Sequence, residues 1–363
     1  MMDLSLLPQP IRSTTMIILE EGWSNTAYVV YGVTPMNRIQ MLATAGALSL
    51  GLMPFRAEAY SAIYVFGDSL SDAGNLLLAT SGTQPAAPYV NGQFSNGPIW
   101  VEGLSQGLGL GPVTPALAGG KDYAFGGATT GYAPTISPTV PVPTLTPQIG
   151  LFLSAIGVPI PSTALYAIWI GSNDIFNILD NGVTGPTALQ QAQGAALTEA
   201  TAIATLAAAG GENFLVPLVS DLGKTPTLTK LGPFVSAAGT TLAQTYNTAL
   251  EADLAVLSST PGINLSFLDT FSLLDAAIAD PVEFGLTNVV APCYIGPYTG
   301  GGSVCATPDQ YLFWDELHPT VIGQALIAKA ALNAVPEPAT LTVVAIGIAG
   351  IAAARRQSKR SVV

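Results

Sequence analysis

Short apolar runs rich in β-branched and aromatic residues alternate along this chain with longer alanine-rich runs. The predicted strands are 62–66, 123–125, 165–170, 214–219 and 265–268. The predicted helices are 98–108, 145–156, 187–209, 234–258 and 319–334. Because the strands are apolar throughout rather than at alternate positions, both faces of their sheet should be covered. Strands that alternate with helices favour right-handed crossovers. The pattern therefore predicts an α/β fold, a three-layer α/β/α sandwich with a central, mostly parallel five-stranded sheet.

The length and composition fit one large domain with a weakly charged, acidic surface. The chain has 363 residues, of which 49% are hydrophobic, so it can bury a sizeable core. Segments 81–97 and 130–147 carry neither pattern and are expected to be long loops, which are often functional. Residues 60–338 contain four lysines, no arginine and 19 acidic residues, a formal charge of −15. This balance excludes nucleic acid as a partner.

The segment 64–72 places a serine on a turn directly after a predicted strand. Its β-formers stop at Gly67, and Asp68 and Ser69 follow. In open α/β sheets this carboxyl edge is where ligands bind. Gly-Asp-Ser is also ordinary turn chemistry, and an unassisted serine hydroxyl is a poor nucleophile. Ser69 is thus a candidate nucleophile only if a base lies within hydrogen-bond reach.

The chain has one histidine, His318, so any Ser-His mechanism must use it. Asp315 stands three positions earlier and can hold one imidazole nitrogen, which fixes the tautomer and stabilises the imidazolium. One histidine excludes a histidine-cluster metal site, and two cysteines alone do not make a structural zinc site. We therefore expect neither a metal nor a cofactor.

Two further segments at predicted strand ends offer donors for an oxyanion hole. Residues 122–128 contain the pair Gly126 and Gly127, where a substrate can approach the backbone N–H closely. Residues 169–174 contain Asn173, whose side-chain amide is a second donor. Each such donor is worth on the order of 3 kcal/mol when it is aimed at a developing oxyanion.

These segments resemble, in order and spacing, the four blocks of the SGNH hydrolases, also called the GDSL esterase/lipase family. The matching stretches are 66–75, 125–128, 171–174 and 315–318, and the resemblance covers essentially all of residues 61–334. It implies a flavodoxin-like fold with Ser69 as nucleophile, His318 as base and Asp315 as its orienter. It also implies an oxyanion hole formed by the N–H of Ser69, by Gly127 and by Asn173, with Gly126 as the alternative to Gly127.

The predicted function is that of an exported serine esterase or lipase that hydrolyses carboxylic esters through an acyl-enzyme. The surrounding sequence resembles the branch that contains secreted lipases, phospholipases and hemolysin-like enzymes. The expected partner is an ester: a lipid, a short acyl ester or an acylated polysaccharide. Two alternatives stay open, namely an acyltransferase to a sugar or lipid hydroxyl that uses the same site, and a non-catalytic surface or matrix protein with the same fold.

The N-terminal region has the anatomy of a secretory signal peptide at residues 36–59. A basic start at Arg38 precedes an apolar run, and Ala57-Glu58-Ala59 forms an A-x-A cleavage site. Cleavage there would leave Tyr60 at the mature N-terminus. Residues 1–35 are interpreted as a misplaced translation start; the alternative is a true extension before an internal signal anchor.

The C-terminal region, residues 335–363, combines Pro336-Glu337-Pro338, an apolar segment at 339–354 and a basic end. An apolar segment followed by positive charge is a stop-transfer pattern, although this one is shorter than the roughly 20 residues of a comfortable membrane span. The tail resembles the PEP-CTERM sorting signal of Gram-negative bacteria. That resemblance implies transient membrane anchoring, removal by a membrane-embedded processing enzyme, and a final location in the periplasm, at the cell surface or in the extracellular matrix. An ordinary C-terminal transmembrane anchor is the alternative.

Cys293 and Cys305 stand close together in a glycine-rich loop. In an oxidising compartment they could form a local disulfide. The alternative is two unrelated free thiols.

Overall fold

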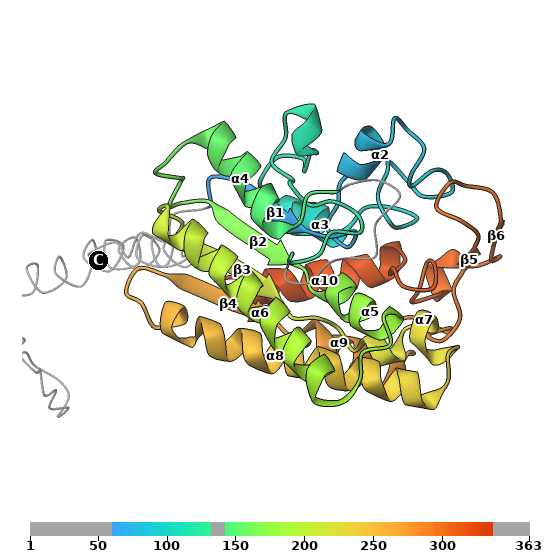
Figure 1. Ribbon diagram of the computed structural model, residues 1–363. Coiled ribbons are helices and arrows are strands. Elements are labelled where there is room, and N and C mark those ends of the chain that lie inside the picture. Colours follow the sequence, from blue (N-terminus) through green and yellow to red (C-terminus); the bar gives the residue numbers. More distant parts are fainter. Residues whose placement is uncertain (1–59, 132–141, 337–363) are drawn as a thin grey trace, which may run out of the picture. The chain divides into compact units, whose positions relative to one another are not determined.

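The computed structural model describes residues 60–131 and 142–336, which all belong to one compact unit (Figure 1). The segment 1–35, the predicted signal peptide at 36–59 and the apolar tail segment at 339–354 lie outside the described residues. Within the described ranges, no helix is both long enough and apolar enough to cross a membrane.

A parallel four-stranded sheet forms the centre of the domain. Its strands are β1 (Ile63–Gly67), β2 (Leu165–Trp169), β3 (Asn213–Pro217) and β4 (Asn264–Leu268), in that order across the sheet. The strands are nearly in register, because Ile63 is paired with Leu165, Leu165 with Asn213, and Asn213 with Asn264. All four carboxyl ends therefore open on one edge, as the α/β prediction requires.

The predicted fifth strand, 123–125, does not form as a regular strand. A single parallel bridge joins Val65 to Asp122, and Tyr123 N–H donates to the Val65 carbonyl at 2.7 Å. Phe125 N–H also donates to the Gly67 carbonyl, at 3.1 Å. A regular ladder does not form, because Gly67 N–H donates to Gln148 Oε1 at 2.9 Å and not to this segment, and Gln148 Nε2 donates to the same Gly67 carbonyl at 2.8 Å. Segment 121–125 thus borders β1 without extending the sheet.

Helices cover both faces of the sheet, as predicted. Side chains at even positions, such as Phe66, Ile168 and Val216, pack against α4 (Leu145–Ile156), α6 (Gly185–Ala208) and α8 (Pro233–Ser258). Those at odd positions, such as Val65 and Trp169, pack against α3 (Trp100–Gly107) and α10 (Val321–Ala334). Figure 1 shows α6 beside α8 on one face and α3 beside α10 on the other.

Several shorter elements were not predicted, because a short helix gives little periodic signal. They are the helices α2 (Asn75–Ala79), α5 (Ser172–Asp180), α7 (Pro226–Thr229) and α9 (Thr270–Ala279), and the antiparallel pair β5 (Tyr294–Ile295) and β6 (Ser303–Val304). Residues 81–97 contain neither helix nor strand, as expected. The predicted loop at 130–147 ends earlier, since α4 begins at Leu145, and residues 132–141 lie outside the described part.

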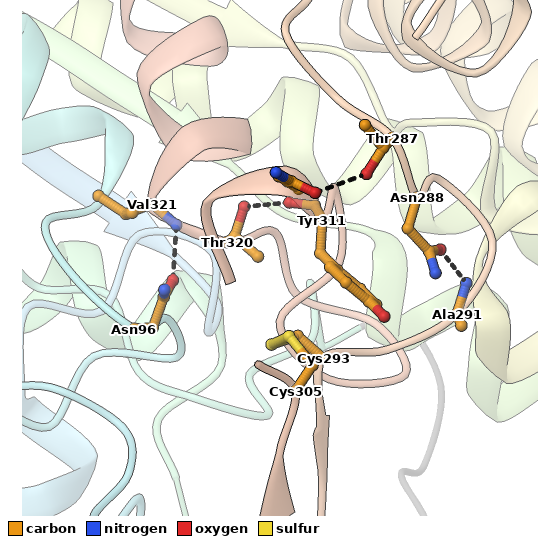
Figure 2. Close-up of a disulfide and its surroundings, with 10 residues drawn as sticks. Asn96, Thr287, Asn288, Ala291, Cys293, Cys305, Tyr311, Thr320 and Val321 are labelled. Atoms are coloured by element: carbon orange, nitrogen blue, oxygen red, sulfur yellow. Dashed lines mark hydrogen bonds between the residues drawn. A yellow bond between two sulfur atoms is a disulfide. The ribbon is translucent and has the colours of Figure 1, made fainter. Parts of the chain in front are cut away.

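A disulfide between Cys293 and Cys305 joins the two sides of the β5–β6 hairpin beside the loop that leads into α10 (Figure 2). The start of α10 is held at two further points. Thr320 Oγ1 donates to the Tyr311 carbonyl at 2.7 Å, and Val321 N–H donates to Asn96 Oδ1 at 2.7 Å. Loop 81–97 is thereby attached to the segment that carries His318.

Candidate active site

Ser69 lies on a tight turn just beyond the carboxyl end of β1. The Asp68 carbonyl accepts hydrogen bonds from the N–H groups of Ser71 and Asp72, each at 3.1 Å. Asp68 Oδ1 accepts a further bond from Leu70 N–H at 3.0 Å. Ser69 is 6% exposed, so the turn presents its hydroxyl in a largely enclosed position.

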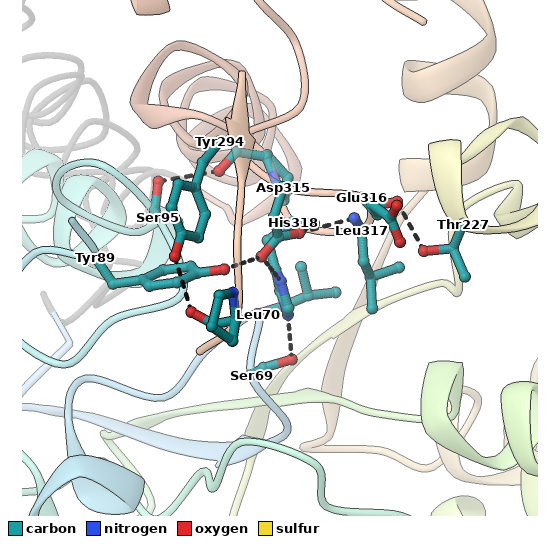
Figure 3. A network of polar contacts seen from close by, with 12 residues as sticks. Ser69, Leu70, Tyr89, Ser95, Thr227, Tyr294, Asp315, Glu316, Leu317 and His318 are labelled. Carbon is teal, nitrogen blue, oxygen red and sulfur yellow. Dashed lines mark hydrogen bonds and ion pairs between the residues drawn. The ribbon is translucent and has the colours of Figure 1, made fainter. Parts of the chain in front are cut away.

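The structure brings Ser69, His318 and Asp315 into one hydrogen-bonded chain (Figure 3). Ser69 Oγ lies 2.7 Å from His318 Nε2, and His318 Nδ1 lies 2.7 Å from Asp315 Oδ2. An ionised Asp315 can only accept a hydrogen bond, so Nδ1 carries the proton and Nε2 is left to accept from the serine hydroxyl. This is the order that a nucleophile, a base and its orienter require.

The environment of Asp315 keeps its carboxylate ionised. Burial acts to raise the pKa of Asp315, but the charge of His318 and the hydrogen bonds that the carboxylate accepts outweigh burial, so its pKa lies below the ordinary value. Two of those bonds are local, because Asp315 Oδ1 accepts from Leu317 N–H at 2.8 Å and from His318 N–H at 2.7 Å. An ionised Asp315 can stabilise a protonated imidazole.

Tyr89 is a site residue that the sequence did not reveal. Its hydroxyl donates to Asp315 Oδ2 at 2.7 Å, the same oxygen that faces His318 Nδ1. The Tyr89 ring packs edge-on against Tyr294 and Trp314, with ring centroids 5.3 and 6.2 Å away. The two partners are 226 positions apart in the chain, and the only hint in the sequence was that residues 81–97 form a long loop.

The two glycines of the second block differ in what their N–H groups do. Gly126 N–H donates to Asp72 Oδ2 at 2.8 Å and is therefore engaged. Among the described residues, no acceptor is paired with the N–H of Gly127 or with that of Ser69. Gly127 has φ +81°, and a Cβ built at this position would meet nothing within 4 Å. The geometry therefore favours Gly127 over Gly126 as an oxyanion donor.

Asn173 lies in the first turn of α5 and faces the same site. Its Nδ2 donates to the Ala128 carbonyl at 2.8 Å and lies 3.5 Å from Asp68 Oδ2. The carboxyl group of Asp68 is itself unusual, because burial raises its pKa to about 7. The hydrogen bond from Leu70 N–H offsets this rise in pKa only in part. Asn173 Nδ2 thus makes a short hydrogen bond to the backbone and a long, weak one to Asp68 Oδ2, at 3.5 Å.

Asp174, next to Asn173, connects the second and third blocks. Its carboxylate accepts from Thr130 N–H at 2.9 Å and from Thr130 Oγ1 at 2.7 Å. Asp174 therefore holds the position of α5 relative to the segment after Gly127.

Among the described residues, no group of three or more His, Cys, Asp or Glu side chains is arranged to hold a metal ion.

Comparison with known proteins gives two family matches. The GDSL-like lipase/acylhydrolase model matches residues 63–331, and the PEP-CTERM protein-sorting motif matches residues 334–357. A Pseudomonas putida protein from the trpE-trpG intergenic region is 31% identical over 78% of this chain and 50% of its own length. A GDSL esterase/lipase of Arabidopsis thaliana is 28% identical over 75% of this chain and 90% of its own length. Esterase EstA of Pseudomonas aeruginosa is 29% identical over 83% of this chain and 51% of its own length. The chain thus spans about half the length of these two Pseudomonas relatives.

Proposed function

This chain belongs to the GDSL-like lipase/acylhydrolase family. From that premise we propose that it is an exported serine esterase or lipase, which hydrolyses carboxylic esters through an acyl-enzyme on Ser69. The observation that carries the proposal is the Ser69–His318–Asp315 chain, with both hydrogen bonds at 2.7 Å, beside two backbone N–H groups that have no acceptor in the described part of the protein.

In the proposed mechanism Ser69 Oγ attacks the ester carbonyl carbon while His318 Nε2 takes the hydroxyl proton. The negative charge that develops on the carbonyl oxygen is stabilised by the N–H groups of Ser69 and Gly127 and by Asn173 Nδ2. The carbon–oxygen bond to the alcohol then breaks, and the alcohol leaves with the proton from His318. Water attacks the acyl-enzyme next, its proton goes to His318, and the acid is released as Ser69 regains its hydrogen.

Export is the second part of the proposal. The match to the PEP-CTERM sorting motif at 334–357 supports sorting to the cell envelope. The disulfide between Cys293 and Cys305 suits an oxidising compartment. We further propose that residues 36–59 are the signal peptide, that 60–334 form the hydrolase domain, and that a processing enzyme in the membrane removes the tail.

The test is to replace Ser69 and His318 separately by alanine and to measure hydrolysis of p-nitrophenyl esters. Each substitution should lower kcat by at least about 10³-fold in a protein that still folds, because the remaining donors cannot replace an activated nucleophile. A fluorophosphonate should label the unsubstituted protein but not Ser69→Ala. Ester hydrolysis at the original rate in either variant would refute the assignment, and product analysis with a competing alcohol separates hydrolysis from acyl transfer.

A further inference from the structure

A pocket with mostly apolar walls opens beside Ser69, and we call it the apolar pocket. At one end it is lined by Asp68, Ser69 and Asn173. Its far wall comes from α9 and α10 and from the segment between them, chiefly Leu273, Leu274, Ala277, Leu312, Leu326 and Ile327. The reacting serine therefore stands at the entrance of a space built from aliphatic side chains.

Apart from Ser69 and Ser172 near the entrance, the hydroxyl groups that line this pocket are paired with protein atoms. Thr225 Oγ1 donates to the Leu222 carbonyl at 2.6 Å, and Thr270 Oγ1 donates to the Leu218 carbonyl. Ser220 Oγ donates to Thr270 Oγ1 at 3.1 Å. A sugar or another polar group in this space would lose its hydrogen bonds to water and find few replacements, whereas a hydrocarbon chain would gain from leaving water.

A second hollow, which we call the polar hollow, lies on the other side of Asn173 and shares Asn173 and Leu317 with the apolar pocket. It is lined by Gly127, Thr227 and the carboxylates of Asp180 and Glu316. No lysine or arginine is among its lining residues, and the nearby Lys230 is paired with Glu316. Apolar and aromatic side chains also line it, namely Phe176, Leu228, Leu231 and Tyr298. This side of the site thus combines polar and acidic groups with apolar ones.

We propose, on the basis of the proposed function, that the apolar pocket binds the acyl chain of a medium- to long-chain fatty acid ester. The polar hollow then binds the alcohol part of the same ester, an uncharged polyol such as glycerol. Asn173 is the proposed oxyanion donor and borders both spaces. The ester carbonyl must therefore sit at their junction, with its acyl group on one side and its alcohol on the other. An anionic headgroup would meet the carboxylate of Asp180 and a Lys230 that already pairs with Glu316, in a segment, 60–338, of formal charge −15.

The acyl half of the proposal is tested with p-nitrophenyl acetate, butyrate, octanoate and decanoate, which share one leaving group. We expect kcat/KM to rise with chain length by up to about fourfold per methylene, because each methylene that enters the pocket leaves water. The variant Ala277→Phe, which fills part of the pocket, should lower kcat/KM for decanoate at least about tenfold more than for acetate. Ala276→Phe on the exposed side of α9 is the matched control and should leave the ratio of kcat/KM for decanoate to kcat/KM for acetate unchanged.

A higher kcat/KM for acetate than for decanoate in the unsubstituted protein would overturn this assignment. So would an equal loss of kcat/KM for acetate and decanoate in Ala277→Phe, or the same selective loss for decanoate in Ala276→Phe. Since Ala277 is 2% exposed, Ala277→Phe could fail to fold. Leu273→Trp, at a partly buried position of the same wall, then carries the same expectation. Failure of the proposed function looks different, because no ester of any length would be hydrolysed and Ser69 would not react with a fluorophosphonate.

The alcohol half is tested with monodecanoylglycerol against decanoyl lysophosphatidylglycerol, which carry the same acyl chain. The uncharged ester should have a kcat/KM at least about tenfold higher, and Asp180→Asn should narrow this gap by removing one repulsive charge. Asp253→Asn, an exposed change on α8 that removes the same charge away from the hollow, should not narrow it. A preference for the anionic ester, or an equal effect of both substitutions, would contradict the assignment.

Discussion

Four donors converge on the carboxylate of Asp315. His318 Nδ1 and the Tyr89 hydroxyl face Oδ2, and the N–H groups of Leu317 and His318 bond to Oδ1. The backbone bonds fix the plane of the carboxylate, whereas Tyr89 fixes the oxygen that orients the imidazole. Tyr89 acts through Asp315 and touches neither Ser69 nor the site of the ester carbonyl, so it is a positioning residue.

We predict that Tyr89→Phe lowers kcat for p-nitrophenyl butyrate by about 10-fold and leaves KM within about twofold, because a hydrogen bond to a charged group is lost away from the substrate. Tyr294→Phe is the matched control. Its hydroxyl belongs to the same aromatic cluster but donates to the carbonyls of Pro297 and Gly301. If both variants lose the same activity, the cluster acts through packing alone and the positioning role is wrong.

At the scale of elements, the turn from β2 into α5 determines where Asn173 lies. Gly171 adopts φ +109°, a conformation that favours glycine, and a Cβ at this position would lie 2.5 Å from the Tyr246 ring. Tyr246 belongs to α8 and is held by its hydrogen bond to Glu199 of α6, at 2.6 Å. The pair of helices α6 and α8 thus supports the turn that carries Asn173, the proposed oxyanion donor.

Gly171→Ala is therefore expected to destabilise the protein by roughly 2–4 kcal/mol and to lower kcat/KM at least about tenfold, because steric overlap with Tyr246 adds to backbone strain. Gly182→Ala is the matched control, since Gly182 has φ +65° but nothing within 4 Å of a built Cβ. It should cost only about 1–2 kcal/mol and leave kcat/KM unchanged. Thermal unfolding and ester kinetics on both variants test this, and equal effects would argue against the steric cause.

At the scale of the whole molecule, several acidic side chains are buried with no lysine or arginine paired to them in the described ranges 60–131 and 142–336. Burial raises the pKa of Asp68 to about 7 and that of Asp174 to about 6, and it raises the pKa of Glu199 well above its ordinary value. The folded protein therefore holds more protons than the unfolded chain between about pH 4 and pH 7, and stability falls as pH rises through this window. Asp315 acts in the opposite direction, but only in more acidic solution, where its lowered pKa begins to matter.

We predict that the thermal midpoint falls by roughly 5–10 °C between pH 5 and pH 8. Glu199→Gln should reduce this fall, because an amide can still accept from Tyr246 without a buried charge. Glu251→Gln, at an exposed position on α8, is the control and should leave the fall in thermal midpoint between pH 5 and pH 8 unchanged. A midpoint that rises from pH 5 to pH 8 would contradict the assigned directions of these pKa shifts.

The sequence by itself determined what depends on nearby residues and on residue type. Continuous apolar strands predicted a covered parallel sheet, and α4 begins and ends where it was predicted. The single histidine with Asp315 three positions before it predicted a His–Asp pair, and the two side chains are hydrogen-bonded to each other because both lie in one loop. A disulfide between Cys293 and Cys305 was foreseeable for the same reason, since only 12 positions separate them.

Tertiary structure decided what depends on contacts between distant parts of the chain. The Gln148 side chain takes up the N–H of Gly67, which lies 81 positions away, and the Tyr89 hydroxyl bonds to Asp315, which lies 226 positions away. Asp72 accepts from the N–H of Gly126, whereas the N–H of Gly127 has no acceptor among the residues that the structure describes. Neither residue type nor spacing could distinguish these two glycines. The apolar pocket likewise exists only where α9 and α10 meet beside Ser69. Such contacts leave no periodic trace along the chain, because folding, and not local preference, brings the partners together.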